Sequence, residues 1–261
     1  KAIPVVVDHS DENQITELFN RIRREQAGRL DVLVNNVYSA IPFLKESFGK
    51  TYYDIDSRSP GEAWDEVNNV GLRNHYICAT LATRMMIEYQ KRELTGRPCL
   101  IVNVSSFGGS CYLFNPLYGC GKEALDRLTR DMDIELKRNK VNICIISLWP
   151  GVVRTEELTQ MASDINDPFF DAYAESTELV GLAVAALTRE DRSTLMARSG
   201  GIVLVSDVVA KHGLREPDGS VPTNYRSLQV LLRLSKYRLA GLVPGFILVP
   251  KSLFAWFIAK R

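Results

Sequence analysis

Short runs dominated by Val, Ile and Leu recur along the chain at intervals that suit strands separated by helices. Five such runs are bounded by polar or turn residues: Val5–Val7, Val32–Val34, Leu100–Val104, Ile143–Leu148 and Ile202–Val205. Continuous rather than alternating apolar strands are typical of a parallel sheet that is buried on both faces. The pattern therefore predicts five strands of one parallel sheet.

Segments with the helical repeat lie between these runs. One apolar stripe follows Ser10-Asp11-Glu12, which suits a helix N-terminus, and consists of Ile15, Leu18, Phe19 and Ile22. Ser59-Pro60-Gly61-Glu62 is a stronger start signal, because it combines a capping hydroxyl, a proline at the first helical position and a glutamate that closes a capping box. We expect the helix that it opens to carry Trp64, Val67, Asn68, Asn69 and Leu72.

The alternation of strands and helices predicts an α/β fold, a Rossmann-like doubly wound parallel sheet. A chain of 261 residues with 46% apolar and 24% charged residues fits one globular domain. We expect that domain over residues 1–238, followed by an apolar C-terminal tail over residues 239–261. Ligands of such sheets bind at the carboxyl ends of the strands.

Charge and cysteine usage exclude several classes of function. The 32 Lys and Arg residues balance 31 Asp and Glu residues, which leaves a net charge of +1 and predicts no nucleic-acid partner. Five cysteines without a CxxC pair and three dispersed histidines predict neither a disulfide framework nor a metal site. The sequon Asn103-Val104-Ser105 lies in a predicted strand, where a glycan has no room.

Polar groups gather at three predicted strand ends. Asn35-Asn36 follows one strand, Ser105-Ser106 follows the next, and Pro150-Gly151 follows a third. Beyond the serines, Tyr118 and Lys122 are one helical turn apart and share a helix face. An ammonium near a phenol favours the charged phenolate and lowers the pKa of the phenol, which suits acid–base chemistry near neutral pH.

Five motifs stand in an order that resembles the classical short-chain dehydrogenases/reductases. They are Asn35-Asn36, Asn69-Val70-Gly71, Ser105-Ser106-Phe107-Gly108-Gly109, Tyr118-x-x-x-Lys122 and Pro150-Gly151-Val152-Val153-Arg154-Thr155. The YxxxK pattern alone is common, whereas the ordered set is specific. The resemblance covers the chain from Val5 to about Val205.

The resemblance implies an enzyme that reduces carbonyl groups with a nicotinamide cofactor. Under it, Tyr118 is the general acid that protonates the carbonyl oxygen, and Ser106 hydrogen-bonds the same oxygen. Lys122 lowers the pKa of Tyr118 and holds the nicotinamide ribose, while Asn69 helps to hold the water chain that resupplies the proton.

Two serines compete for the serine role. The SSxxG frame selects Ser106, whereas the commonest serine-to-tyrosine spacing of the family selects Ser105. We favour Ser106, because neighbouring residues of a strand point to opposite faces and a shortened loop is easier to accommodate than a changed frame.

The resemblance also implies the cofactor contacts. Asp8 corresponds to the adenine contact and Asn35 to the amide near the adenosine ribose, and Tyr118 and Lys122 face the nicotinamide ribose. The contacts along the nicotinamide and pyrophosphate fall on Pro150, Gly151, Val153 and Thr155. NADP is the cofactor that the resemblance implies, with NAD as the alternative.

One part of the family pattern is missing. The sequence contains no TGxxxGxG, the glycine-rich loop that cradles the pyrophosphate, nor the residue after it that selects NADP or NAD. In the family this loop precedes the strand that we expect at Val5–Val7, so we expect an N-terminally incomplete domain.

Aromatic residues near the predicted site indicate a broad apolar pocket. Two long connections, Ile41–Arg58 and Met161–Ser176, suit binding loops. The aromatic residues concerned are Tyr38, Tyr112, Phe114, Trp149, Phe169, Phe170 and Tyr173. A steroid or an aromatic xenobiotic ketone would suit such a pocket, although these aromatics could equally serve only to pack the core.

The tail Leu239–Ala259 is strongly apolar but is interrupted by Pro244, Pro250 and Lys251. A spanning helix needs about 20 mostly uninterrupted apolar residues, so we expect an interfacial anchor or a dimer contact, with core packing as the alternative. The resemblance implies the cytosolic face of the endoplasmic reticulum, with the cytoplasm as the alternative, and a homo-oligomer. A different function also stays open, that of a catalytically weak dinucleotide-binding scaffold.

Overall fold

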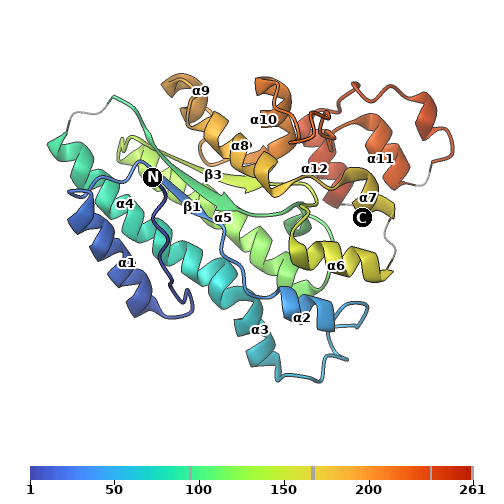
Figure 1. The fold of residues 1–261 in the computed structure, drawn as a ribbon, viewed down its shortest axis with the longest axis horizontal. Coiled ribbons are helices and arrows are strands. Elements are labelled where there is room, and N and C mark those ends of the chain that lie inside the picture. The colour runs from blue at the N-terminus through green and yellow to red at the C-terminus, as the bar shows by residue number, and fades with distance from the viewer. Residues whose placement is uncertain (94–95, 166–167, 236, 260–261) are drawn as a thin grey trace.

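A four-stranded parallel sheet forms the centre of the computed structural model, which describes residues 1–93, 96–165, 168–235 and 237–259. The strands are β1 (Val32–Asn35), β2 (Cys99–Val104), β3 (Ile143–Trp149) and β4 (Ile202–Leu204), in the order β1-β2-β3-β4. Asn35 pairs with Asn103, which pairs with Ser147, so the polar strand ends are in register. The predicted α/β Rossmann-like sheet is confirmed (Figure 1).

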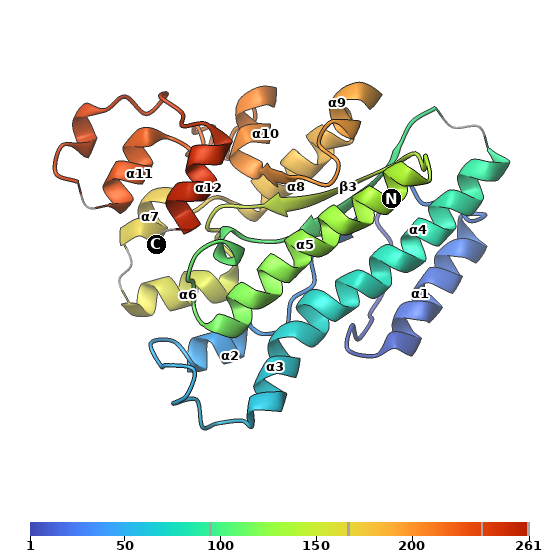
Figure 2. The same ribbon diagram turned by 180° about the vertical axis from the view of Figure 1, so that it is seen from behind.

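Helices cover both faces of the sheet (Figures 1 and 2). On one face lie α1 (Glu12–Glu25), α4 (Asn74–Arg92) and α5 (Pro116–Arg138), and on the other α8 (Thr177–Leu187), α9 (Arg192–Met196) and α10 (Val205–His212). In β3, Ile143 and Ile145 pack toward α1 and α4, whereas Cys144 and Ile146 pack toward α8. Burial on both faces explains why the strands are continuously apolar.

The remaining elements lie in the connections between strands or in the chain after α10, and they gather on one side of the molecule (Figures 1 and 2). They are α2 (Ile41–Glu46), α3 (Pro60–Asn68), a π-helical turn (Asn69–Arg73), a 3-10 turn (Phe107–Gly109), α6 (Glu156–Ile165), α7 (Pro168–Tyr173), α11 (Leu228–Leu234), a second 3-10 turn (Ala240–Leu242) and α12 (Lys251–Ala259).

The helix starts follow the sequence closely. Asp11 caps α1, and Ser59 and Glu62 form both halves of the capping box that opens α3. The helix expected to continue to Leu72 does not stay α-helical, because the amide of Asn74 bonds the carbonyl of Asn69, five residues earlier. Such a π-turn widens the helix locally and is frequent at functional sites.

One predicted strand is absent, and another ends one residue early. Val5–Val7 is not a strand, since no strand of the described residues pairs with it, and Val6 is fully exposed. Hydrophobicity alone does not make a strand, because the backbone groups need a hydrogen-bonding neighbour. At the other end of the sheet β4 stops at Leu204, and Val205 begins α10.

A buried chain of polar side chains ties the strand ends to two helices. The Asn35 amide donates to the carbonyl of His75 in α4 (3.1 Å) and to Asn103 Oδ1 (2.9 Å). Asn103 in turn donates to Thr129 Oγ1 of α5 (2.9 Å), which also accepts from Ser147 Oγ (3.1 Å). Asn103 is wholly buried, so it cannot carry a glycan, as we expected.

The C-terminal tail packs partly onto the domain. Its Leu248 forms a backbone bridge with Ser227, and Phe254 and Phe257 contact the apolar cluster around Trp149. Other tail residues, Leu242 and Phe246 among them, stay exposed, and residues 260 and 261 lie outside the described residues. Across the described ranges, we find no helix with the length and apolar character to span a membrane.

We predict that Asn103→Ala lowers the free energy of unfolding by about 3 kcal/mol, because it removes the two buried hydrogen bonds that join Asn103 to Asn35 and Thr129. Chemical denaturation measures the loss, with the exposed Asn13 of α1 as control site. Equal losses for Asn103→Ala and Asn13→Ala would show that the buried chain contributes nothing.

Candidate active site

Tyr118 and Lys122 lie on one face of α5, both buried, one turn apart. The helix begins where it does because Asn115 Oδ1 accepts the amide hydrogen of Tyr118 (3.0 Å) and Pro116 occupies the first turn. The cap and the packed α5–β3 face fix the two side chains at the carboxyl end of β2, as the sequence predicted.

The Lys122 side chain is buried, and its ammonium contacts one carbonyl and two aromatic rings. Its Nζ donates to the carbonyl of Val104 (3.2 Å) and lies 4.8 Å from the ring centroid of Tyr38 and 5.9 Å from that of Tyr118. Burial lowers the pKa of Lys122 to about 8, an effect that the nearby Asp126 carboxylate partly offsets. Part of the charge is therefore lost just above neutral pH.

Asp126 is a buried carboxyl that the sequence analysis missed. Both of its oxygens accept from Trp149 Nε1 (3.2 and 3.1 Å), and the nearby hydroxyls of Ser105 and Ser147 also favour its charged form. Burial raises its pKa, against the effect of these hydrogen bonds. The sequence contained a signal for a buried carboxyl here, because Asp126 follows Lys122 by one helical turn on the helix face that packs against the sheet.

The structure distinguishes the two serines. Ser106 Oγ accepts the amide hydrogen of Gly108 (3.1 Å), and the Ser106 side chain hydrogen-bonds that of Tyr118. Burial raises the pKa of Tyr118 to about 12, and the bond to Ser106 partly offsets this. Ser105 Oγ instead donates to the carbonyl of Lys122 (3.2 Å). Of the two serines, Ser106 is thus the one whose hydroxyl lies next to that of Tyr118.

Tyr38 packs behind the pair rather than in the substrate pocket where we expected it. Its ring meets that of Tyr118 edge to face, with 6.1 Å between centroids. A Cβ at Gly71 would lie 2.5 Å from the same ring, so only glycine fits there. The Tyr38 hydroxyl is buried, and no hydrogen-bond partner for it exists among the described atoms.

An apolar pocket of about 740 Å³ opens beside Ser106 and Tyr118. As far as the described residues line it, the wall carries no charged side chain. The expected aromatics Tyr112, Phe114, Trp149 and Phe170 line it, with Phe48 from the first long connection. Tyr173 packs against the Trp149 cluster instead, and the side chain of Phe169 lies outside the described part. Figure 2 shows the elements that surround this end of α5.

The loop after β3 contributes part of the pocket wall. Pro150, Gly151 and Val153 line it, and the amide of Gly151 donates to the buried carboxyl of Glu175 (2.9 Å). Thr155 does not line the pocket and instead accepts the amide hydrogen of Leu158 at the start of α6 (3.2 Å). Burial raises the pKa of Glu175 to about 7, against the effect of the Gly151 bond.

Besides Lys122 and Thr155, three further predicted residues do not line this pocket. Asn69 is half-buried in the π-turn, and Asp8 is exposed, with its carboxylate accepting from Ser10. The side-chain amide of Asn35 is used inside the protein by His75 and Asn103. Their cofactor or water contacts stay predictions.

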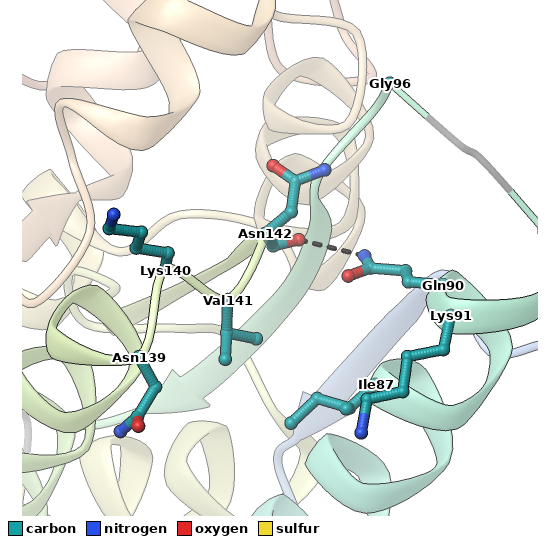
Figure 3. Close-up of a pocket in the computed structure, with 8 residues that line it drawn as sticks. All are labelled: Ile87, Gln90, Lys91, Gly96, Asn139, Lys140, Val141 and Asn142. Carbon is teal, nitrogen blue, oxygen red and sulfur yellow. Dashed lines mark hydrogen bonds between the residues drawn. The ribbon is translucent and has the colours of Figure 1, made fainter.

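A second hollow, of about 470 Å³, lies at the opposite ends of the strands. Its wall joins Gly96, just before β2, to Asn142, just before β3, and Gln90 donates to the carbonyl of Asn142 (2.9 Å; Figure 3). This hollow lies away from the carboxyl ends of the strands, where ligands of such sheets bind, and so it is separate from the candidate active site. Within the described chain no group of His, Cys, Asp or Glu suits a metal ion.

Comparison with known proteins assigns the chain to a family. The family model described as short chain dehydrogenase matches residues 1–166. Dehydrogenase/reductase SDR family member 1 from Homo sapiens is 38% identical over 271 residues, an alignment that covers 100% of this chain and 82% of the relative. The chain therefore belongs to the short-chain dehydrogenase/reductase family.

Solved structures agree with the fold. ElxO with NADP bound is 24% identical, with a TM-score of 0.59 over 76% of this chain and 74% of that one. A 4-hydroxyisoleucine dehydrogenase complexed with NADH is 23% identical, with a TM-score of 0.56 over 77% of each chain. The fold of this chain is thus shared with solved structures that hold NADP or NADH.

We predict that Ser106→Ala lowers the oxidoreductase kcat about 100-fold, because it removes a hydrogen-bond donor at the Tyr118 hydroxyl. Ser105→Ala is the matched control and should lose less than tenfold, since Ser105 bonds a backbone carbonyl. Steady-state kinetics of both variants tests which serine takes part in catalysis. A larger loss of kcat in Ser105→Ala than in Ser106→Ala would assign that role to Ser105.

Proposed function

We propose that the protein is an NAD(P)H-dependent carbonyl reductase that acts on neutral hydrophobic ketones, with Tyr118 as the general acid. One observation carries the proposal. The hydroxyls of Tyr118 and Ser106 meet at an uncharged pocket, with the Lys122 ammonium buried directly behind them.

The residues at this end of the pocket fit a nicotinamide riboside. An ammonium has three donors, and Lys122 gives one of them to Val104, so the remaining donors suit ribose hydroxyls. Tyr118 shares that helix face, and Pro150, Gly151 and Val153 form the neighbouring wall. We propose NADP as the cofactor, with NAD as the alternative, and the reduced nicotinamide supplies the hydride that adds to the carbonyl carbon.

Each residue then has a defined task. Ser106 holds the carbonyl oxygen next to the phenol, and Tyr118 Oη gives its proton to that oxygen as the carbonyl becomes an alcohol. The phenolate left on Tyr118 is stabilised by the Lys122 ammonium until a water-borne proton replaces the one given. The π-turn at Asn69 is the proposed route of that proton. In the free protein, with the pKa of Tyr118 near 12, the phenol is a weak acid, so the positive charges near it decide its strength.

The pocket supports a substrate class rather than a single substrate. Aromatic and aliphatic residues from the 3-10 turn, α6, α7 and α12 enclose a space of about 740 Å³, large enough for a drug-sized molecule. Burial of a carboxylate or phosphate there would be costly without a partner. We therefore propose neutral steroid or aromatic xenobiotic ketones.

The exposed apolar residues of the tail support a further part of the proposal. Leu242 and Phe246 are 79% and 83% exposed, as apolar side chains are at a membrane surface or a subunit contact. We propose that the protein works as a homo-oligomer at the cytosolic face of the endoplasmic reticulum, with the cytoplasm as the alternative.

The full-length protein should oxidise NADPH in the presence of steroid and aromatic ketones, with NADH assayed in parallel. Tyr118→Phe should lose at least about 100-fold in kcat, because general acid catalysis contributes on that scale. Tyr76→Phe on the exposed face of α4 is the matched control and should stay within about twofold.

Failure of both cofactors to turn over any ketone, although each binds, would contradict the reductase and favour the catalytically weak dinucleotide-binding scaffold. Equal turnover by Tyr118→Phe and the wild type would contradict the assignment of the acid.

A further inference from the structure

Tyr38 takes up a position next to both members of the acid–base pair. It follows β1, far from α5 in sequence, yet its ring lies 4.8 Å from Lys122 Nζ and meets the Tyr118 ring edge to face. A cation at this distance from a ring face is attracted by the ring quadrupole, most strongly where water is excluded. Lys122 is such a cation, because it is buried.

One edge of the Tyr38 ring lies against the π-turn. Gly71 approaches so closely that a Cβ would lie 2.5 and 2.6 Å from two neighbouring ring carbons. A side chain at this position would therefore push the ring out of its place. The absence of a side chain at Gly71 lets the ring lie where it meets the Lys122 ammonium.

The other titratable groups around Lys122 are few among the described residues. Asp126 on α5 attracts the ammonium, and Tyr118 on the same helix is neutral in the free protein. His75 on α4 stays uncharged, because burial and the Lys122 charge lower its pKa to about 3. The ammonium donates a hydrogen bond to the carbonyl of Val104. Of the two aromatic rings near it, the Tyr38 ring is the nearer, at 4.8 Å against 5.9 Å for the Tyr118 ring.

We propose that Tyr38 is a positioning residue of the reductase site, whose ring, with one edge against Gly71, holds the Lys122 ammonium charged and in place against Tyr118. The role in catalysis rests on the proposed function, whereas the contact with Lys122 does not.

The side chain of Lys122 can be titrated by NMR of ¹³Cε-labelled lysine, with its signal assigned from Lys122→Met. Removal of the ring in Tyr38→Leu or Tyr38→Met should move this titration to lower pH by about one unit, because the charged form loses its aromatic partner. Tyr38→Phe keeps the ring and is the matched control, with an unchanged titration. Gly71→Ala, which pushes the ring away, should act like Tyr38→Leu and add nothing to it in the double variant.

The kinetic counterpart uses the full-length enzyme. Loss of the ring should lower kcat about tenfold and move the alkaline limb of the pH profile to lower pH, while Tyr38→Phe keeps both. An unmoved Lys122 titration in Tyr38→Leu and Tyr38→Met would overturn the proposal, whether or not the enzyme turns over. A moved titration without any reductase activity would support the contact and contradict only the proposed function. A loss in Tyr38→Phe as large as in Tyr38→Leu would also overturn it, because the hydroxyl would then be the active part.

Discussion

Burial of the Lys122 ammonium is the constraint on which the site depends. A charge taken out of water is stable only with partners, and the protein supplies the Val104 carbonyl, the Asp126 carboxyl and the Tyr38 ring. These groups come from β2, α5 and the segment after β1. The charge can therefore be held only when the carboxyl ends of two strands and one helix are brought together, which couples the fold to the chemistry.

The surrounding polar groups extend that arrangement through the sheet. Asp126 accepts from Trp149 Nε1, so the carboxyl beside the ammonium also holds an aromatic wall of the pocket. Thr129 lies about one turn after Asp126 on α5 and bonds both Asn103 of β2 and Ser147 of β3. Asn103 also bonds Asn35 of β1, so the three strand ends are joined to the helix. The neutral pocket lies on one side of Tyr118, and the Lys122 ammonium and the Asp126 carboxyl lie outside its described wall. This separation suits a carbonyl that must receive a proton in an apolar space.

Periodic and local signals predicted the elements well, because continuously apolar strands and the helix starts at Asp11 and Ser59 depend on residues close together in sequence. Tyr118, Lys122 and Ser106 were predicted from ordered motifs. Val5–Val7 was wrong because a strand needs a neighbour that an apolar run does not reveal. The contact of Tyr38 with Gly71 was missed because it depends on tertiary packing between segments apart in sequence. Asp126 was missed although its spacing of one helical turn from Lys122 placed it on the same face of α5.

The central claim is that positive charge behind and beside Tyr118 converts a buried, weakly acidic phenol into an acid that works near neutral pH. Tyrosinate absorbance of the full-length protein with oxidised cofactor bound, taken as wild type minus Tyr118→Phe, tests it most directly. The account predicts ionisation of one phenol more than two pH units below the value of about 12 for the free protein, and its loss in Lys122→Met. No ionisation of Tyr118 below pH ~10, the ordinary pKa of a phenol, would contradict the account.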